Sequence, residues 1–115
     1  KTLLGKNRVF GERGKKNLKI SPVEFAKKME NAGAGEILLT NIDKENSWTG
    51  YDLDTIAHVV SAVNIPVIAN GGAGTEEDIK KVLEITDAAA IGSMAVYQKQ
   101  GMGVLINFPK NIYDY

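Results

Sequence analysis

Three short apolar runs recur along the chain, and each is followed by a loop and then by a segment with helical spacing of its apolar residues. The runs are EILLT at 36–40, IPVIAN at 65–70 and DAAAIG at 87–92. A short, continuous apolar run is typical of a strand that is buried on both faces. The pattern therefore predicts three buried strands.

The helical segments carry start signals at their first residues. Ser21 stands as an N-cap with Glu24 three residues later, which is the arrangement of a capping box. Thr75 and Asp78 repeat that spacing, and Asp52 stands as the cap of the segment between them. These signals predict three helices that begin directly after Ser21, Asp52 and Thr75.

Strand, loop and helix alternate at a spacing of roughly 25 residues, which is typical of a parallel α/β sheet. Right-handed crossovers place the loops that follow the strands at one edge of such a sheet. Both an open doubly wound sheet and an eight-stranded barrel fit this order, and the small residues at the strand ends favour the barrel. Three strands leave two open edges, and the chain opens on Lys1 rather than Met. We therefore expect that the rest of a barrel is missing from this chain or that a second copy supplies it.

The chain divides into three parts. Residues 1–20 read as a basic hairpin, 21–101 hold the three strand–helix units, and 102–115 form a C-terminal tail. The last unit ends in a brief predicted helix, SMAVYQKQ at 93–100. The lysines and arginines of the hairpin form either a solvated ribbon or a loop over an active-site mouth that attracts anionic substrate.

Composition narrows the class of protein. The 14 basic and 14 acidic residues balance to a formal net charge of zero, so there is no basic field to attract nucleic acid. Cysteine is absent, which is compatible with a reducing compartment, and no run approaches the ~20 apolar residues of a membrane span. Without a histidine–cysteine cluster we expect no metal site, and we expect no cofactor. We expect a cytoplasmic protein with no nucleic acid or membrane partner.

The stretch VIANGGAGTEEDI at 67–79 is the strongest candidate for chemistry. Its glycines do not match a dinucleotide fingerprint, because Glu77 stands where the third glycine would fall, and no Gly-Lys-Ser/Thr closes a phosphate loop. A turn that uses glycine for positive φ is one reading. The other is an anion site, because Gly92 and Ser93 open a helix after the next strand. In barrels, neighbouring loops of this kind form a phosphate site from backbone N–H groups and a helix N-terminus.

Four segments together carry a resemblance to a known family: GAGEILLTNID at 33–43, GYDLDTI at 50–56, IPVIANGGAG at 65–74 and DAAAIGSM at 87–94. From about residue 16 to 98 the chain closely resembles the second half of the cyclase subunit of imidazole glycerol phosphate synthase. The resemblance implies an α/β fold, the C-terminal half of a (β/α)8 barrel, with the hairpin following the fifth strand. It also implies histidine biosynthesis, a glutaminase partner that supplies ammonia, and a phosphorylated ribotide substrate.

Site residues follow from the same resemblance. The positions that match the family's substrate and phosphate site are Gly71, Gly72, Gly92, Ser93, Thr40 and Asn70, the last standing where the family commonly has serine. The loop after EILLTNID normally carries an Asp-Gly pair that helps to hold the phosphate, and this chain has Glu45-Asn46 there. The family's acid and base are aspartates at the ends of the first and fifth strands. Neither strand is present, so we expect no catalytic residue in this chain and no cyclisation by these 115 residues alone.

The tail departs from the histidine-pathway enzyme. VLINFP at 104–109 is more similar to cyclase-like paralogues of surface-polysaccharide biosynthesis, which are thought to supply ammonia for amidation of a sugar. The Glu45-Asn46 change fits that alternative. An alternative from another class is a non-catalytic half-barrel that associates with itself and binds phosphorylated metabolites.

Four further residues are candidates for lesser roles. His58 is expected at a helix surface, and Asp87 is expected to be structural because it precedes its strand. Asp43 fits either a turn or a substrate contact. Trp48 in the same loop fits a cap on the pocket or packing against the rim.

Overall fold

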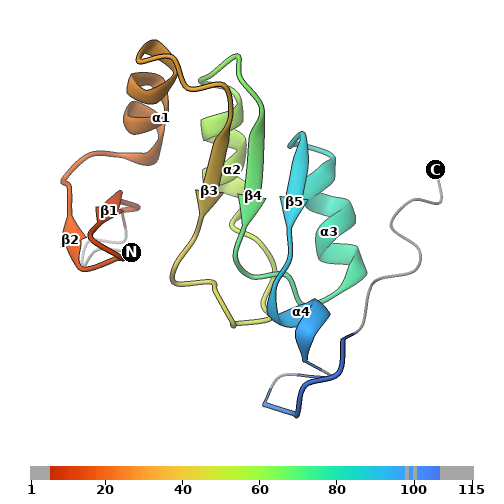
Figure 1. The fold of residues 1–115 in the computed structure, drawn as a ribbon. Coiled ribbons are helices and arrows are strands. Elements are labelled where there is room, and N and C mark those ends of the chain that lie inside the picture. The colour runs from red at the N-terminus through yellow and green to blue at the C-terminus, as the bar shows by residue number, and fades with distance from the viewer. Residues whose placement is uncertain (1–5, 98, 100, 107–115) are drawn as a thin grey trace.

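The computed structural model describes residues 6–97, 99 and 101–106 as three βα units preceded by a small hairpin (Figure 1). The elements, in chain order, are β1 Phe10–Gly11, β2 Lys16–Asn17, α1 Pro22–Asn31, β3 Ile37–Thr40, α2 Leu53–Val60, β4 Val67–Asn70, α3 Glu76–Leu83, β5 Ala88–Ala90 and α4 Ser93–Val96. Strands β1 and β2 pair antiparallel within the predicted basic segment. No helix among the described residues combines the length and the apolar character needed to cross a bilayer.

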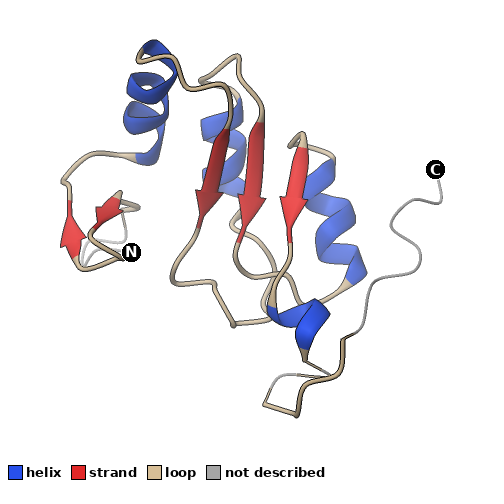
Figure 2. Cartoon of the chain, in the orientation of Figure 1, coloured by secondary structure: helices blue, strands red, loops and turns tan. Residues whose placement is uncertain are grey.

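Strands β3, β4 and β5 form a parallel sheet in sequence order, which confirms the prediction of parallel units. The register pairs Thr40 with Asn70 and Asn70 with Ala90, so the carboxyl ends of all three strands lie at one edge. Helices α1, α2 and α3 lie together on one side of the sheet (Figure 2). This arrangement places the loops that follow the strands next to one another.

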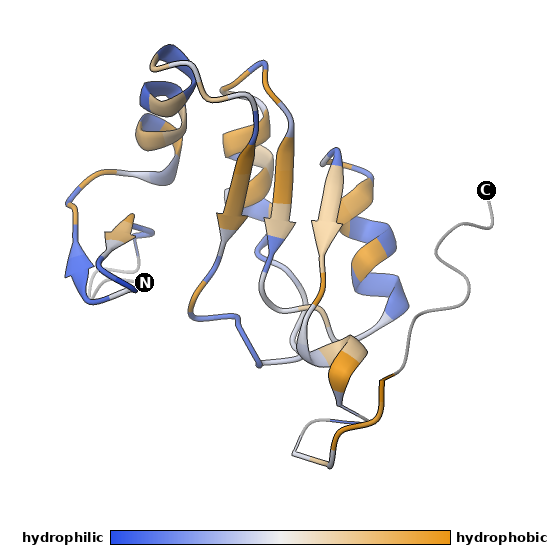
Figure 3. Cartoon of the chain, in the orientation of Figure 1, coloured by the Kyte–Doolittle hydropathy of each residue, from blue (hydrophilic) through white to orange (hydrophobic). Residues whose placement is uncertain are grey.

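The core lies between the sheet and these helices. One cluster gathers Tyr51, Ile56, Ala69 and Val82, and a second gathers Ala26, Val59 and Val67. The side chains of Val59 and Val82 are 0% exposed, and burial of a side chain of this size contributes about 1.5–3 kcal/mol. Figure 3 shows the apolar residues along the strands and on the helices beside them. The sheet is therefore stabilised by packing of one of its faces against these helices.

The opposite face of the sheet is less well covered than the sequence predicted. Leu38 is 60% exposed, whereas Val67 and Ala69, on the face toward the helices, are buried. The prediction of strands buried on both faces is thus wrong for this chain on its own. The physical reason is that α1 to α3 cover one face only, while in a barrel the other face is covered by side chains of the remaining strands.

Local hydrogen bonds confirm the predicted helix starts. Ser21 and Thr75 each form a complete capping box, with Glu24 and Asp78 respectively at the third helical position. The side-chain hydrogen bond from Ser21 is the main reason that the pKa of Glu24 is lowered. Asp52 accepts from the backbone N–H of Thr55 and caps α2. Each cap satisfies backbone donors that a helix leaves open at its first turn.

The fourth helix is shorter than predicted. It ends at Val96, because Tyr97 adopts an extended conformation and pairs with Val104 in an antiparallel bridge. Residues 98 and 100 of the predicted helix and 107–115 of the predicted tail lie outside the described residues. A tertiary contact between the two segments therefore overrides the helical tendency of the sequence.

Candidate functional site

The carboxyl edge of the sheet carries two polar side chains at equivalent positions. Thr40 ends β3 and Asn70 ends β4, and the register places them directly side by side. The Nδ2 atom of Asn70 donates to Oγ1 of Thr40 over 3.2 Å. The structure therefore brings these two predicted site residues together in an otherwise apolar sheet.

The glycine turn after β4 is packed beneath the loop that follows β3. A Cβ atom at Gly71 would lie 2.6 Å from the carbonyl oxygen of Asn41, and one at Gly72 would lie 2.2 Å from that of Gly50. Both glycines have positive φ, 95° and 112°. A Cβ at Gly74 would lie 2.5 Å from the carbonyl oxygen of Trp48. Glycine is therefore required here by close backbone approach as well as by conformation.

Hydrogen bonds decide which groups of this turn remain open to a ligand. Gly50 donates its N–H to the carbonyl of Gly72 over 2.8 Å, and Asp78 accepts from the N–H groups of Gly74 and Thr75. Among the described residues, the N–H groups of Gly72 and Ala73 donate to no acceptor. Because Gly72 is buried, an unpaired donor there is costly, and an anion or a water would satisfy it.

The loop after β5 contacts the loop after β3 through side chains. The hydroxyl of Ser93 donates to Oδ1 of Asn46. Asn46 has a φ of 58°, a left-handed conformation that asparagine tolerates better than most residues. The neighbouring Gly92 is exposed, and a Cβ added to it would meet nothing within 4 Å. Gly92 is therefore not required by packing, unlike Gly72.

The predicted pair Glu45-Asn46 is only partly engaged with the site. The backbone N–H of Glu45 donates to the carbonyl of Asn41 over 3.2 Å, and the residue is exposed. Lys44 lies closer to the glycine turn, because its own Cβ would be 3.3 Å from a Cβ placed on Gly72. Its Nζ donates to Oγ1 of Thr49 over 3.1 Å. Lys44 is a cation that the sequence reading did not single out.

Tyr51 is a second residue that the sequence reading missed. Its hydroxyl donates to the carbonyl of Ala90 over 2.8 Å, which ties the loop after β3 to the end of β5. The side chain is 7% exposed, and this burial, with a smaller contribution from the Asp78 carboxylate, raises the pKa of Tyr51 to about 12. The available signal was the place of this tyrosine directly before the helix cap Asp52. A tyrosine that is buried there normally has a hydrogen-bond partner for its hydroxyl.

Tyr51→Phe should change stability in a pH-dependent way. The folded-state pKa of about 12 lies above the ordinary 10.0, so between these values the unfolded chain releases the proton and the folded protein keeps it. Stability of the unmodified protein therefore falls as the pH rises from 10 to 12. At neutral pH the variant should be less stable by about 1 kcal/mol, because a carbonyl loses its donor. Urea unfolding of both intact proteins across this pH range should show that the difference in their free energies of unfolding narrows. A constant difference would contradict the raised pKa of Tyr51.

A pocket of about 580 Å³ lies beside the loop after β3, and two of its lining residues, Asn41 and Lys44, also contact the glycine turn. It is lined by Asn41, Asp43, Lys44, Tyr51, Asp52, Leu53 and Asp54. Three carboxylates against one lysine disfavour a phosphate, and none of the predicted phosphate residues lines this cavity. The lining of this pocket therefore does not match the predicted phosphate residues.

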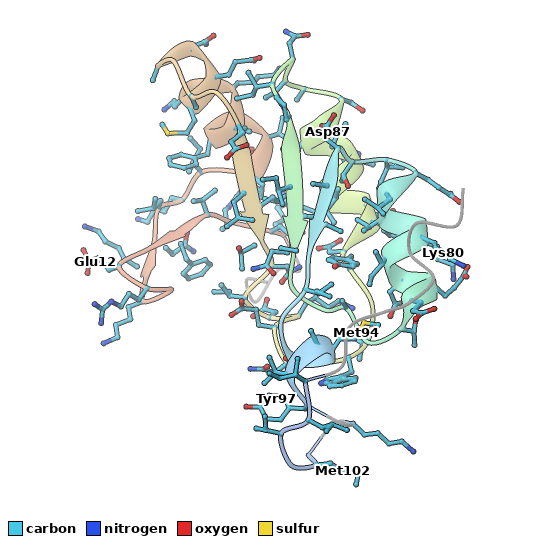
Figure 4. The ribbon with its side chains drawn as sticks, turned by 45° about the vertical axis from the view of Figure 1, so that its right-hand side comes forward. Glu12, Lys80, Asp87, Met94, Tyr97 and Met102 are labelled. Carbon is cyan, nitrogen blue, oxygen red and sulfur yellow. The ribbon has the colours of Figure 1, made fainter. Side chains whose placement is uncertain are left out.

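The remaining candidates have structural contacts. Asp87 lies at the amino end of β5, the end opposite Met94 (Figure 4), and accepts the N–H of Val67 over 3.1 Å, which confirms its structural role. His58 is exposed and contacts the carbonyl of Asp54 through Nδ1. Asp43 uses its N–H in a turn with the side chain of Asn41. Among the described side chains, no group of three or more His, Cys, Asp or Glu could hold a metal ion.

Comparison with known proteins identifies the family. The family model described as histidine biosynthesis protein matches residues 2–101. The chain belongs to this family. The three βα units are accordingly part of a (β/α)8 barrel, which is the fold of the family, and the resemblance drawn from the sequence is confirmed.

Curated relatives agree with this family. The chain is 52% identical over 91 residues to imidazole glycerol phosphate synthase subunit HisF of Lactococcus lactis subsp. cremoris MG1363, covering 77% of this chain and 35% of the relative. It is 49% identical over 81 residues to the HisF subunit of Sulfurisphaera tokodaii, covering 70% and 32%. A putative subunit hisF2 of Pseudomonas aeruginosa PAO1 is 40% identical over 107 residues, covering 91% and 43%. The chain thus spans between 32% and 43% of the length of these relatives.

Proposed function

We propose that the protein carrying this chain is a cyclase of the imidazole glycerol phosphate synthase type, and that the chain builds one of its substrate phosphate sites. The observation that supports this most strongly is the meeting of three loops at the carboxyl edge of the sheet. There, the open N–H of Gly72 lies in a buried glycine turn, and Ser93 is joined to the loop after β3 through Asn46. This is the edge at which barrel enzymes bind their ligands.

In the proposed complex, the phosphate holds one end of a phosphorylated ribotide. The glycines Gly71 and Gly72 present backbone without side chains, and Gly92 and Ser93 approach from the next loop. Thr40 and Asn70, joined by their 3.2 Å hydrogen bond, face the body of the substrate. Anchoring the phosphate orients the reacting atoms and reduces the entropy cost of the reaction.

The acid and base of the reaction lie outside this chain in our proposal. The family resemblance assigns them to aspartates at the ends of the first and fifth barrel strands, so these 115 residues would bind without catalysing. A glutaminase partner would supply ammonia, and two carboxylates would transfer the protons. The face of the sheet that exposes Leu38 would be covered by the first half of the barrel.

Turnover of the histidine intermediate tests this proposal. The intact protein, given ammonium salt and the phosphoribosyl-formimino aminoimidazole carboxamide ribotide, should form imidazole glycerol phosphate and the aminoimidazole carboxamide ribotide. Both products are followed by chromatography. Removal of ammonia is the control. A folded, intact protein that forms neither product contradicts the proposal.

A second candidate is a cyclase-like paralogue that supplies ammonia for amidation of a surface-polysaccharide sugar. It is supported by the tail segment VLINFP at 104–109, which is more similar to such paralogues, and by the Glu45-Asn46 pair. The match to the putative imidazole glycerol phosphate synthase subunit hisF2 covers 91% of the chain and so extends past residue 101 into this tail. The HisF matches at 77% need not include that tail. The glycine site would serve a phosphorylated substrate in both proteins, so absence of histidine-pathway turnover with retained phosphate binding favours this candidate.

A further inference from the structure

We infer that Asn46, rather than the hydroxyl of Ser93, is the side-chain donor to the bound anion in this chain. The inference rests on the proposed phosphate site and identifies the side chain that donates a hydrogen bond to the phosphate. It follows from one contact between residues 47 positions apart in the sequence, in which the Ser93 hydroxyl donates to Oδ1 of Asn46.

The direction of that hydrogen bond shows which donors and acceptors remain available on the side chains of Ser93 and Asn46. The hydroxyl of Ser93 has one proton, and Asn46 accepts it, so Ser93 presents lone pairs on its other side. A phosphate dianion needs donors and is repelled by lone pairs. The amide nitrogen Nδ2 of Asn46 carries two protons, and among the described residues neither has an acceptor. The amide is therefore the group of this pair that has protons left to donate to an anion.

The backbone explains why this position can carry a side chain at all. Asn46 adopts a φ of 58°, which glycine and asparagine tolerate and most residues do not. Glycine could adopt the same φ, so Asn46 adds an amide at a backbone position that glycine would also fit. A glycine at position 46 would have no side chain to accept from Ser93. The Ser93 hydroxyl would then be free to donate to the phosphate. Asn46 thus transfers the donor role from one loop to the other.

Lys44 connects the Asn46 loop to the glycine turn. The side chain of Lys44, two residues before Asn46, begins beside Gly72, where the open backbone N–H lies. The cluster combines a backbone donor, an amide donor and a nearby cation, and the carboxylate of Asp78 in the first turn of α3 is engaged by the N–H groups of Gly74 and Thr75. Such a set fits a phosphate monoester.

Binding of inorganic phosphate to the intact protein, followed by ³¹P NMR titration, tests the inference without turnover. Asn46→Asp keeps size and backbone conformation but replaces the donor by a carboxylate, so affinity should fall by about 100-fold. Ser93→Ala should cost less than about 3-fold, because its hydroxyl does not donate to the anion. Circular dichroism of each variant checks that the fold is retained.

A double variant provides the sharper measurement. In Asn46→Gly the Ser93 hydroxyl is released and compensates in part, so Ser93→Ala should cost about 10-fold in that background and far less in the unmodified one. A large loss from Ser93→Ala alone, or a loss from Asn46→Asp below about 3-fold, would overturn the inference. Absence of saturable phosphate binding by the unmodified protein would also overturn it. Failure of the ribotide assay alone would leave it standing.

Discussion

Gly72→Ala should destabilise the intact protein by about 4 kcal/mol, because a backbone clash and backbone strain combine at this residue. The new Cβ would lie 2.2 Å from the carbonyl oxygen of Gly50, and this neighbour is backbone that cannot rotate away. The φ of 112° adds a conformation that an alanine rarely adopts. The free energy of unfolding, measured by denaturant titration, should reveal the loss, and the hydrogen bond from Gly50 to Gly72 should be lost with it.

Gly92→Ala is the matched control, since it changes a glycine of the same proposed site. Gly92 has a negative φ of −130°, and an added Cβ meets nothing within 4 Å. The change in unfolding free energy should stay within about 0.5 kcal/mol. If the two variants lose equal stability, the close packing of the loop against Gly72 is wrong.

Asp52→Ala should destabilise the protein by about 3 kcal/mol, since the carboxylate caps a helix and joins three segments. Its Oδ1 accepts from the N–H of Thr55, and its Oδ2 accepts from the hydroxyl of Thr55 over 2.9 Å. Asn41, from the loop after β3, and Asn7, from the chain before β1, donate to the same Oδ2 over 3.0 and 3.1 Å. Denaturant unfolding measures the total, and hydrogen exchange should show faster opening of the first turn of α2.

Asp54→Ala serves as its control. Asp54 is exposed in the same first turn of α2 and shares the favourable interaction with the helix dipole. Its removal should cost below about 1 kcal/mol. A loss as large as that of Asp52→Ala would mean that charge at the helix start matters more than the network around Asp52.

The helices and strands of this chain were predictable where they depend on residues close together in the sequence. The capping boxes at Ser21 and Thr75 were read directly from spacing, because their hydrogen bonds join residues three apart. The end of α4 was not predictable, since it depends on the pairing of Tyr97 with Val104. The exposure of Leu38 was missed because a strand pattern does not state which of its two faces this chain covers.

The candidate site divides along the same line. The glycines and Ser93 were predicted from the order of strand, turn and helix, and Thr40 and Asn70 from the resemblance to the cyclase family. Tyr51 and Lys44 were missed, because their importance comes from contacts with Ala90 and with the glycine turn. Nothing in the spacing of residues predicts a hydrogen bond between loops.

The sequence by itself determined the parallel βα order, the helix starts and the position of the glycine turn after β4, since periodicity, capping and turn signals act within a few residues. Only the tertiary structure decided what each glycine faces: Gly72 lies against a backbone carbonyl, and Gly92 faces open space. It also decided that Asn46 holds Ser93, 47 residues away. These outcomes depend on how loops from different strands meet at one edge of the sheet, and that meeting follows from the register of the strands.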